Sequence, residues 1–293
     1  MNHELALDKR LLRRSFEKAA AGYDAAAVLQ HEICRRMLMR LEYIKHRPAA
    51  ILDAGSGTGN VVAALRARYP QATLYALDIA LAMVRRSRAR APWWRRLLGR
   101  GVVPVCGDIE RLPLRGAAVG MVWSNLALQW VNDAPRAFAE FRRVLAPGGL
   151  LMFSTFGPDT LKELRAAYRG TDRYTHINRF IDMHDLGDML VHGGFADPVM
   201  DMEYVTLTYT DVLALMHDLK AIGAHNVTAG RRQGMTARAT LAAVECNYEA
   251  LRRDGRLPAT FEVIYGHAWV PQPRTTADGK TVIPIKVSKR SPL

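Results

Sequence analysis

Short apolar runs alternate with helix-like patterns along most of the chain, from Ala49 onward. This alternation is typical of βαβ units, in which helices join parallel strands and cover the sheet. The runs predicted as core strands are residues 49–54, 73–77, 102–106, 121–124 and 150–155, followed by two later runs at 204–209 and 260–269. The pattern therefore predicts an α/β fold with a sheet of seven strands, most of them parallel.

The segments between these runs carry helix patterns that end at proline or glycine. Residues 60–69 precede Pro70, and residues 134–145 precede the sequence Ala146-Pro147-Gly148-Gly149, so both helices are expected to stop there. Further helices are predicted over residues 81–92, 159–168 and 185–191.

A long helical segment, residues 211–255, separates the last two predicted strands. It is too long for an ordinary connection, so we expect an inserted helical lid, with an N-terminal helix over residues 11–41 as its companion. The expected division is an N-terminal helical lid segment 1–46, a core 47–208, a helical insertion 209–257, a final core strand 258–270 and a tail 271–293.

The composition is that of an ordinary globular protein, because 49% of the 293 residues are apolar and 24% are charged. No stretch is long and apolar enough for a membrane span, and the first residues lack a secretory signal, so a cytoplasmic location is expected. The three cysteines lie far apart, which favours reduced thiols and no metal site.

The formal net charge of +13 favours an anionic partner, whether nucleic acid, a membrane face or an acidic protein. Part of the charge is concentrated between Ile79 and Gly107, where the chain has seven arginines and no acid: Arg85, Arg86, Arg88, Arg90, Arg95, Arg96 and Arg100. Trp93 and Trp94 lie within this run. It is either a solvated helix face or a docking surface.

A glycine-rich turn, Asp53-Ala54-Gly55-Ser56-Gly57-Thr58-Gly59, directly follows the first predicted strand and opens a helix. Gly55, Gly57 and Gly59 suit a tight turn where the backbone approaches a ligand. Asp78, followed by Ile79, ends the second strand, where an acid can accept hydrogen bonds from ribose hydroxyls. A nucleoside-containing cofactor is therefore predicted.

The spacing of the glycines distinguishes between cofactors. Dinucleotide sites have a third glycine where this chain has Asn60. An acidic Asp53 beside the loop would repel phosphates, but it would suit the cationic amino acid group of S-adenosyl-L-methionine. Asp53 has an alternative role as a cap for the turn.

Two more strand ends carry polar residues: Asp108-Ile109 follows the third strand, and Asn125 opens the sequence Asn125-Leu126-Ala127-Leu128-Gln129-Trp130 after the fourth. In this order the elements resemble those of class I methyltransferases. The resemblance implies a Rossmann-like sheet with an antiparallel last strand, an adenine contact at Asp108 and Ile109, and a reaction site edged by Asn125. It implies S-adenosyl-L-methionine as the cofactor.

Other segments resemble the malonyl-acyl-carrier-protein O-methyltransferases of biotin synthesis, over about residues 11–269. The segments that carry this resemblance are residues 15–24, 125–130 and 154–158, His176-Ile177-Asn178-Arg179-Phe180, and Leu219-Lys220-Ala221-Ile222-Gly223-Ala224. Membership implies methylation of the free malonyl carboxylate on an acyl carrier protein, which allows fatty acid synthesis to extend it as an ordinary acyl chain. Such carriers are acidic, which suits the basic charge.

The chemistry of this transfer needs positioning more than acid–base groups. A carboxylate with a pKa near ~4 is ionised at neutral pH, so no general base is required. We expect Tyr23 to cover the cofactor, Arg179 to clamp the malonyl carboxylate, and His176 and Asn178 to orient the thioester or Arg179. Packing or surface ion pairing is the alternative for each of these, and Lys220 is a further candidate for substrate or carrier contact.

Two other functions fit part of the sequence. Asn178-Arg179-Phe180 and Pro258-Ala259-Thr260 also resemble methyltransferase-like assembly factors of respiratory NADH dehydrogenase, which are thought to hydroxylate an arginine. An RNA methyltransferase would suit the charge, but the chain has no base-amine motif after the fourth strand, so nucleic acid is a less expected partner.

Overall fold

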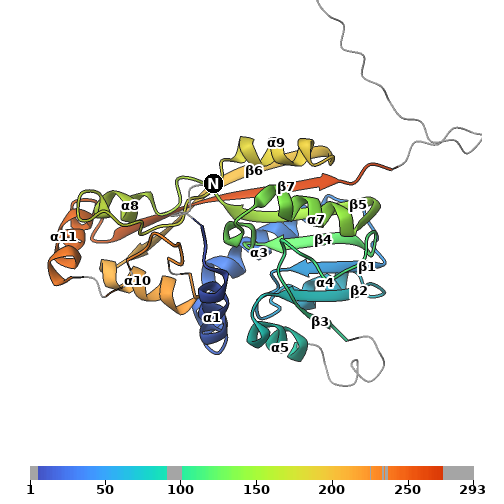
Figure 1. Ribbon diagram of the computed structural model, residues 1–293, viewed down its shortest axis with the longest axis horizontal. Coiled ribbons are helices and arrows are strands. Elements are labelled where there is room, and N and C mark those ends of the chain that lie inside the picture. Colours follow the sequence, from blue (N-terminus) through green and yellow to red (C-terminus); the bar gives the residue numbers. More distant parts are fainter. Residues whose placement is uncertain (1–5, 91–100, 225, 233, 235–236, 273–293) are drawn as a thin grey trace, which may run out of the picture.

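The computed structural model describes residues 6–90, 101–224, 226–232, 234 and 237–272. A seven-stranded sheet in the order β3-β2-β1-β4-β5-β7-β6 forms its centre (Figure 1). The strands are β1 Ala50–Ala54, β2 Thr73–Asp78, β3 Val103–Cys106, β4 Val119–Asn125, β5 Leu145–Phe156, β6 Ala196–Tyr209 and β7 Leu257–Trp269. β1 to β5 run parallel, whereas β7 is antiparallel to both of its neighbours. The predicted sheet is confirmed.

Helices cover both faces of the sheet. On one face, α3 (Val28–Glu42) and α4 (Val62–Arg68) bury apolar side chains such as Ile33, Met37 and Leu65 against the strands. On the other, α7 (Ala134–Val144) and α9 (Met183–His192) contribute Phe138, Phe141 and a second group of buried residues. Burial on both faces explains why the central strands are continuous apolar runs.

The N-terminal segment was expected as a single helix, residues 11–41, and that expectation is wrong. The structure has three helices there: α1 Lys9–Ala19, α2 Tyr23–Ala26 and α3. The breaks fall at Gly22 (φ −103°, ψ 0°) and Ala27 (φ −82°, ψ 40°), where the backbone leaves the helical region. Glycine weakens a helix interior through its backbone freedom, so the first break has a local cause.

β5 and β6 exceed their predicted ranges by the most residues. β5 was expected from Leu150, but pairing with β4 already begins at Leu145 and resumes after an irregularity near Gly120. β6 was expected over residues 204–209, yet it starts at Ala196 and pairs with β7 along its length. β6 is an edge strand, where a residue such as Pro198 is tolerated and alternating exposure hides the apolar signal.

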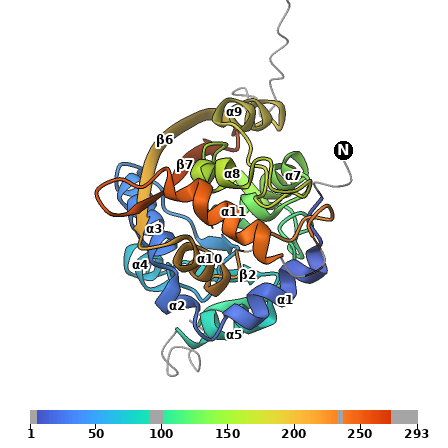
Figure 2. The same ribbon diagram turned by 90° about the vertical axis from the view of Figure 1, so that its left-hand side faces the viewer.

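The remaining helices gather at one end of the molecule. These are α8 (Lys162–Tyr168), α10 (Val212–Ala221) and α11 (Arg238–Glu249) (Figures 1 and 2). α8 packs against α11, and α10 contacts α2. The helix predicted over residues 81–92 is α5 (Leu81–Ala89), which packs against α1. The helical pattern of residues 211–255 is thus confirmed as two helices, while its separation as a lid unit stays a prediction.

Within the described part of the chain, no helix has the length and apolar character to cross a membrane, and no cluster of three metal-ligating residues occurs. All three cysteines are free thiols. The tail beyond Gln272 and the basic residues Arg95, Arg96 and Arg100, with Trp93 and Trp94, lie outside the described residues.

Candidate active site

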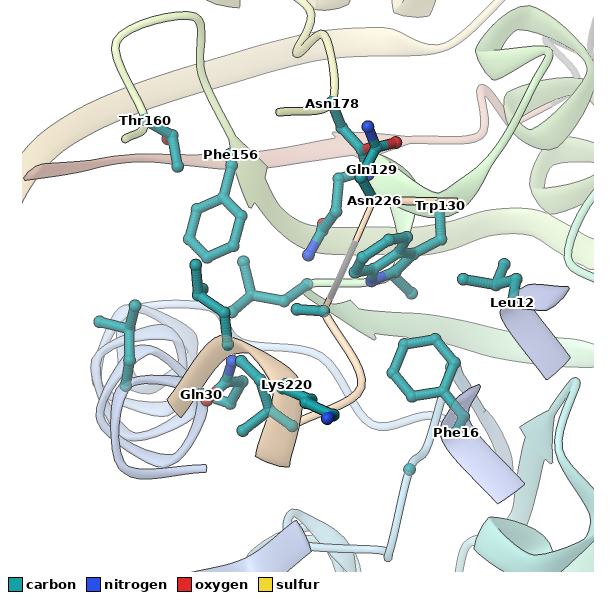
Figure 3. A pocket seen from close by; sticks show the side chains of 18 of the residues that line it. Leu12, Phe16, Gln30, Gln129, Trp130, Phe156, Thr160, Asn178, Lys220 and Asn226 are labelled. Carbon is teal, nitrogen blue, oxygen red and sulfur yellow. The ribbon is translucent and has the colours of Figure 1, made fainter. Parts of the chain in front are cut away.

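A cavity of about 790 Å³ opens beyond the carboxyl ends of β1, β2 and β4. The glycine loop, Asp78 and Asn125 form its floor, and α1, α2, the start of α3 and α10 form its walls. Figure 3 shows aromatic side chains, among them Phe16, Trp130 and Phe156, around its interior. Parallel α/β sheets bind ligands at this edge, so the topology and the cavity agree.

The glycine loop uses its residues in different ways. Gly55 has φ +80°, and an added Cβ would stand 2.3 Å from Ala127 Cβ, so only glycine fits there. Gly57 has φ +51°, and an added Cβ would make van der Waals contact with the Tyr23 ring, 3.9 Å from its Cε1 atom. Gly59 does not line the cavity; it packs against Ser87 of α5. Two of the three predicted glycines therefore face the ligand space, and the third allows close helix packing.

Asp78, at the end of β2, holds the loop and faces the cavity. Its Oδ2 accepts from Gly57 N at 3.0 Å, and its Oδ1 accepts from Ala80 N at 2.8 Å. Burial raises the pKa of Asp78 to about 6, although these backbone hydrogen bonds lower it in part. The group is therefore an anion at neutral pH, with lone pairs available to ribose hydroxyls.

Asp53 is placed differently from the expectation. It is only 2% exposed and is not among the residues that line the cavity, so it lies beneath the loop. Its Oδ2 has no hydrogen-bond partner among the described residues. Burial and the nearby Asp78 raise the pKa of Asp53 to about 8, so it is mostly protonated at pH 7. The predicted electrostatic contact with a cationic amino acid group is not supported by this geometry.

The end of β3 forms the far edge of the cavity, with Ile79, Asp108 and Ile109 in its wall. Lys9 of α1 reaches this edge: its Nζ lies 3.2 Å from Asp108 Oδ2, and it also pairs with Glu110. These contacts fasten the N-terminal helix over the strand ends. Sequence reasoning missed Lys9, which has no motif around it.

The end of β4 is joined to helix α3. Asn125 Oδ1 accepts from Ser154 Oγ at 2.8 Å, while Asn125 Nδ2 donates to the backbone oxygen of Gln30 at 3.2 Å. Leu126, the next residue, has φ +51°, a conformation that non-glycine residues rarely adopt outside constrained sites. Asn125 is thus both part of the cavity wall and the tie between the sheet and α3.

Three of the four predicted reaction-site residues line the cavity: Tyr23, His176 and Asn178. His176 stacks on Tyr168 with ring centroids 3.7 Å apart, and its Nε2 lies 2.7 Å from Asp172 Oδ1. Asn178 is buried, and its Oδ1 has no partner among the described residues. A buried amide oxygen without a donor is costly, so Asn178 has unused capacity to bind a ligand.

Arg179 does not join them. Its side chain is exposed and lines a second cavity of about 300 Å³, which shares Gln129, Asn178 and Phe180 with the first. Two lysines line the main cavity, Lys9 and Lys220. Because Lys9 is engaged by two carboxylates, Lys220 is the lysine without an acidic partner among the described cavity residues.

Residues 52–153 match the model of a family described as a methyltransferase domain. The chain is 59% identical to a malonyl-[acyl-carrier protein] O-methyltransferase of Gallionella capsiferriformans, over 96% of this chain and 97% of that protein. A protein of the same name from Nitrosospira multiformis is 58% identical, with 94% of each chain covered. The chain belongs to this methyltransferase family. It is therefore an S-adenosylmethionine-dependent methyltransferase, as predicted.

Solved structures agree on the fold of the methyltransferase. A putative methyltransferase from Bacillus halodurans superimposes with a TM-score of 0.56 at 18% identity, covering 80% of this chain and 97% of that one. The residues of the cavity fit the cofactor: Asp78 offers acceptor oxygens at the end of β2, and the buried amide oxygen of Asn178 has no donor among the described residues. Because S-adenosylmethionine contains no phosphate, the glycine loop needs no phosphate-binding group.

Some cavity residues of the methyltransferase were not assigned to the site from the sequence, although two of them lie in segments that carry the family resemblance. Gln30 of α3, Phe16 of α1 and Trp130 line the cavity, and Phe16 meets Trp130 edge-to-face at 5.5 Å. Gln30 and Phe16 stand on helices far from the glycine loop in sequence, so only tertiary packing brings them to the site.

Proposed function

We propose that this methyltransferase transfers the methyl group of S-adenosyl-L-methionine to the free carboxylate of malonyl-acyl carrier protein. The support is the extent of similarity: relatives with this name are 55 to 59% identical over nearly the whole chain, including the helices around the cavity. The product is the methyl ester of the malonyl thioester. In this ester the carboxylate charge is masked, which suits it as a primer for pimeloyl synthesis in the biotin pathway.

The cavity suits a reaction driven by positioning. The bound cofactor supplies an electrophilic methyl group, and an ionised carboxylate attacks it in line, so the protein has no proton to remove. Burial, with added effects of Asp78 and Asp24, raises the pKa of Tyr23 well above its usual range. Tyr23 therefore remains protonated and acts by covering the site. Correct alignment and exclusion of water can supply roughly 7 to 11 kcal/mol.

Lys220 is the better candidate to hold the malonyl carboxylate. It stands on α10 in the cavity wall, whereas Arg179 lines the neighbouring cavity. Phe156, Leu164 and Phe261 line other parts of the same cavity, whereas the Lys220 side chain is exposed, as is that of Arg179. An ammonium at the cavity mouth attracts a carboxylate and leaves one of its oxygens free to attack. His176 and Asn178 stay candidates to orient the thioester.

The carrier protein is expected to dock on the outer side of α1 and α5. These helices contact each other, and α1 also presents Leu12 and Phe16 to the cavity, so the outer surface lies beside the site (Figure 2). Its exposed cations are Arg10, Arg13, Arg14 and Lys18 of α1 and Arg85, Arg86 and Arg88 of α5. Acyl carrier proteins are acidic, so charge complementarity favours this surface.

The decisive experiment is mass spectrometry of malonyl-loaded carrier protein after incubation with the enzyme and S-adenosylmethionine. One added methyl group that an esterase removes is the expected result, and an unmodified carrier would contradict the proposal. Malonyl-coenzyme A tested in parallel identifies the preferred substrate.

The role of Lys220 is tested by comparison with Arg179. Lys220→Met should raise KM for the malonyl carrier by roughly ten- to a hundredfold, the value of a charge-assisted contact, with an unchanged Kd for S-adenosylhomocysteine. Arg179→Met should change KM only a few-fold. If the arginine variant has the larger effect, the original assignment of Arg179 is restored.

A further inference from the structure

Gln30 of α3 has a feature that the glycine-loop chemistry leaves unexplained. It lines the main cavity, yet its Oε1 atom is inaccessible to solvent and has no hydrogen-bond partner among the described residues. Leaving a buried carboxamide oxygen without a donor costs about 1 to 3 kcal/mol. A side chain held in this state beside a ligand space is a candidate ligand contact.

The location of Gln30 indicates which part of the cofactor it meets. Along the sheet edge, Asp108 follows β3, Asp78 ends β2, the glycine loop follows β1, and Asn125 ends β4. The first two positions suit the adenine and the ribose. The amino acid end of the cofactor is therefore expected beyond the loop, toward β4, where Asn125 Nδ2 holds the backbone oxygen of Gln30 at 3.2 Å.

The residue first expected to recognise this end does not reach it. Asp53 lies beneath the loop, outside the cavity wall, and carries a proton at neutral pH. In Figure 3, Gln30 lies on the side of the cavity that carries Lys220, opposite Gln129 and Asn178. Gln30 thus places a carboxamide in the cavity wall, whereas Asp53 does not line the cavity.

Resting on the proposed function, we infer that the Gln30 carboxamide binds the amino acid group of S-adenosylmethionine. A carboxamide has one accepting oxygen and two N–H donors, which complement an ammonium and a carboxylate on the same carbon. The terminal torsion of a glutamine side chain rotates readily, so the oxygen can turn toward the cavity and accept from the ammonium while the nitrogen donates to the carboxylate. Asn125, itself held by Ser154, is the positioning residue that fixes this part of α3.

The inference is tested by calorimetric titration with two ligands. S-adenosylhomocysteine has the amino acid group, and 5′-methylthioadenosine has the same nucleoside without it. Gln30→Met preserves the length of the side chain and removes both hydrogen-bonding groups. It should weaken S-adenosylhomocysteine roughly ten- to a hundredfold, the usual value of hydrogen bonds to charged groups, and leave 5′-methylthioadenosine within twofold.

Gln129→Met is the matched control, because Gln129 is another cavity carboxamide, on the opposite side. It should leave the affinity for both ligands unchanged. The inference is overturned if Gln30→Met binds S-adenosylhomocysteine as tightly as the parent, or loses the same factor for both ligands. A parent enzyme that binds neither ligand would instead refute the proposed function, so the two failures are distinguishable.

Discussion

Replacing Asp53 by asparagine gives the sharpest test of how the cofactor loop is built. The pKa of Asp53 is raised from its ordinary value of 3.8 to about 8, by burial and by Asp78. The folded protein therefore keeps a proton that the unfolded chain releases above about pH 4. The pKa of Asp53 is higher in the folded protein than in the unfolded chain. The proton therefore stabilises the fold fully below pH 4, and this stabilisation is lost as the pH rises toward 8.

The expected magnitude follows from the pH interval. Between these two pKa values, each pH unit lowers the free energy of unfolding by about 1.4 kcal/mol. From pH 5 to pH 7, ionisation of the Asp53 carboxyl therefore lowers it by up to about 3 kcal/mol. Asparagine has a similar shape and no such dependence. The stability of Asp53→Asn relative to the parent should thus rise by up to about 3 kcal/mol over this interval.

Urea unfolding of the cofactor-free protein at pH 5 and pH 7 measures this difference directly. Asp254→Asn, the same chemical change on an exposed turn, is the control, and its effect should vary by less than about 0.5 kcal/mol. A stability difference between Asp53→Asn and the parent that is equal at both pH values would refute the reasoning. It would mean that Asp53 is already ionised in the fold.

Two further predictions concern the N-terminal helix and its neighbour. Replacing Arg85 and Arg88 by glutamate should raise KM for malonyl carrier protein several-fold at low salt and leave KM for malonyl-pantetheine unchanged. Equal changes in the two KM values would contradict docking of the carrier at α5. Lys9→Met removes the ion pairs to Asp108 and Glu110, which contribute about 1 kcal/mol. Hydrogen exchange of the α1 amides should therefore accelerate roughly fivefold. Unaltered exchange would mean that packing alone holds α1 in place.

The cofactor half of the site was predictable because its signals are local. Gly55, Gly57 and Asp78 follow strands directly, and parallel strands bring their carboxyl ends to one edge. Asp53 and Gly59 belong to the same motif, yet neither lines the cavity. A motif does not specify which of its members face a ligand.

The substrate half was less predictable, because it depends on contacts between distant segments. Asn178 and Arg179 are neighbours in an irregular stretch, yet only Asn178 lines the main cavity. Successive side chains of an extended chain point to different sides, so a motif read as a unit was divided between two cavities. The helix break at Gly22 was also not predicted. It begins α2 and places Tyr23 opposite Gly57.

Different walls of the cavity face the cofactor and the methyl acceptor, which explains how a common fold acquires a particular substrate. The sheet edge supplies backbone and carboxylate contacts that suit a nucleoside whatever group receives the methyl. The opposite wall comes from α2, α3 and α10, which provide Tyr23, Gln30 and Lys220 from segments outside the nucleoside-binding motifs. Because the sheet edge contacts the nucleoside, we expect this wall to select the acceptor. A change of substrate within the fold therefore requires new helix packing around the cavity, and the glycine loop can stay as it is.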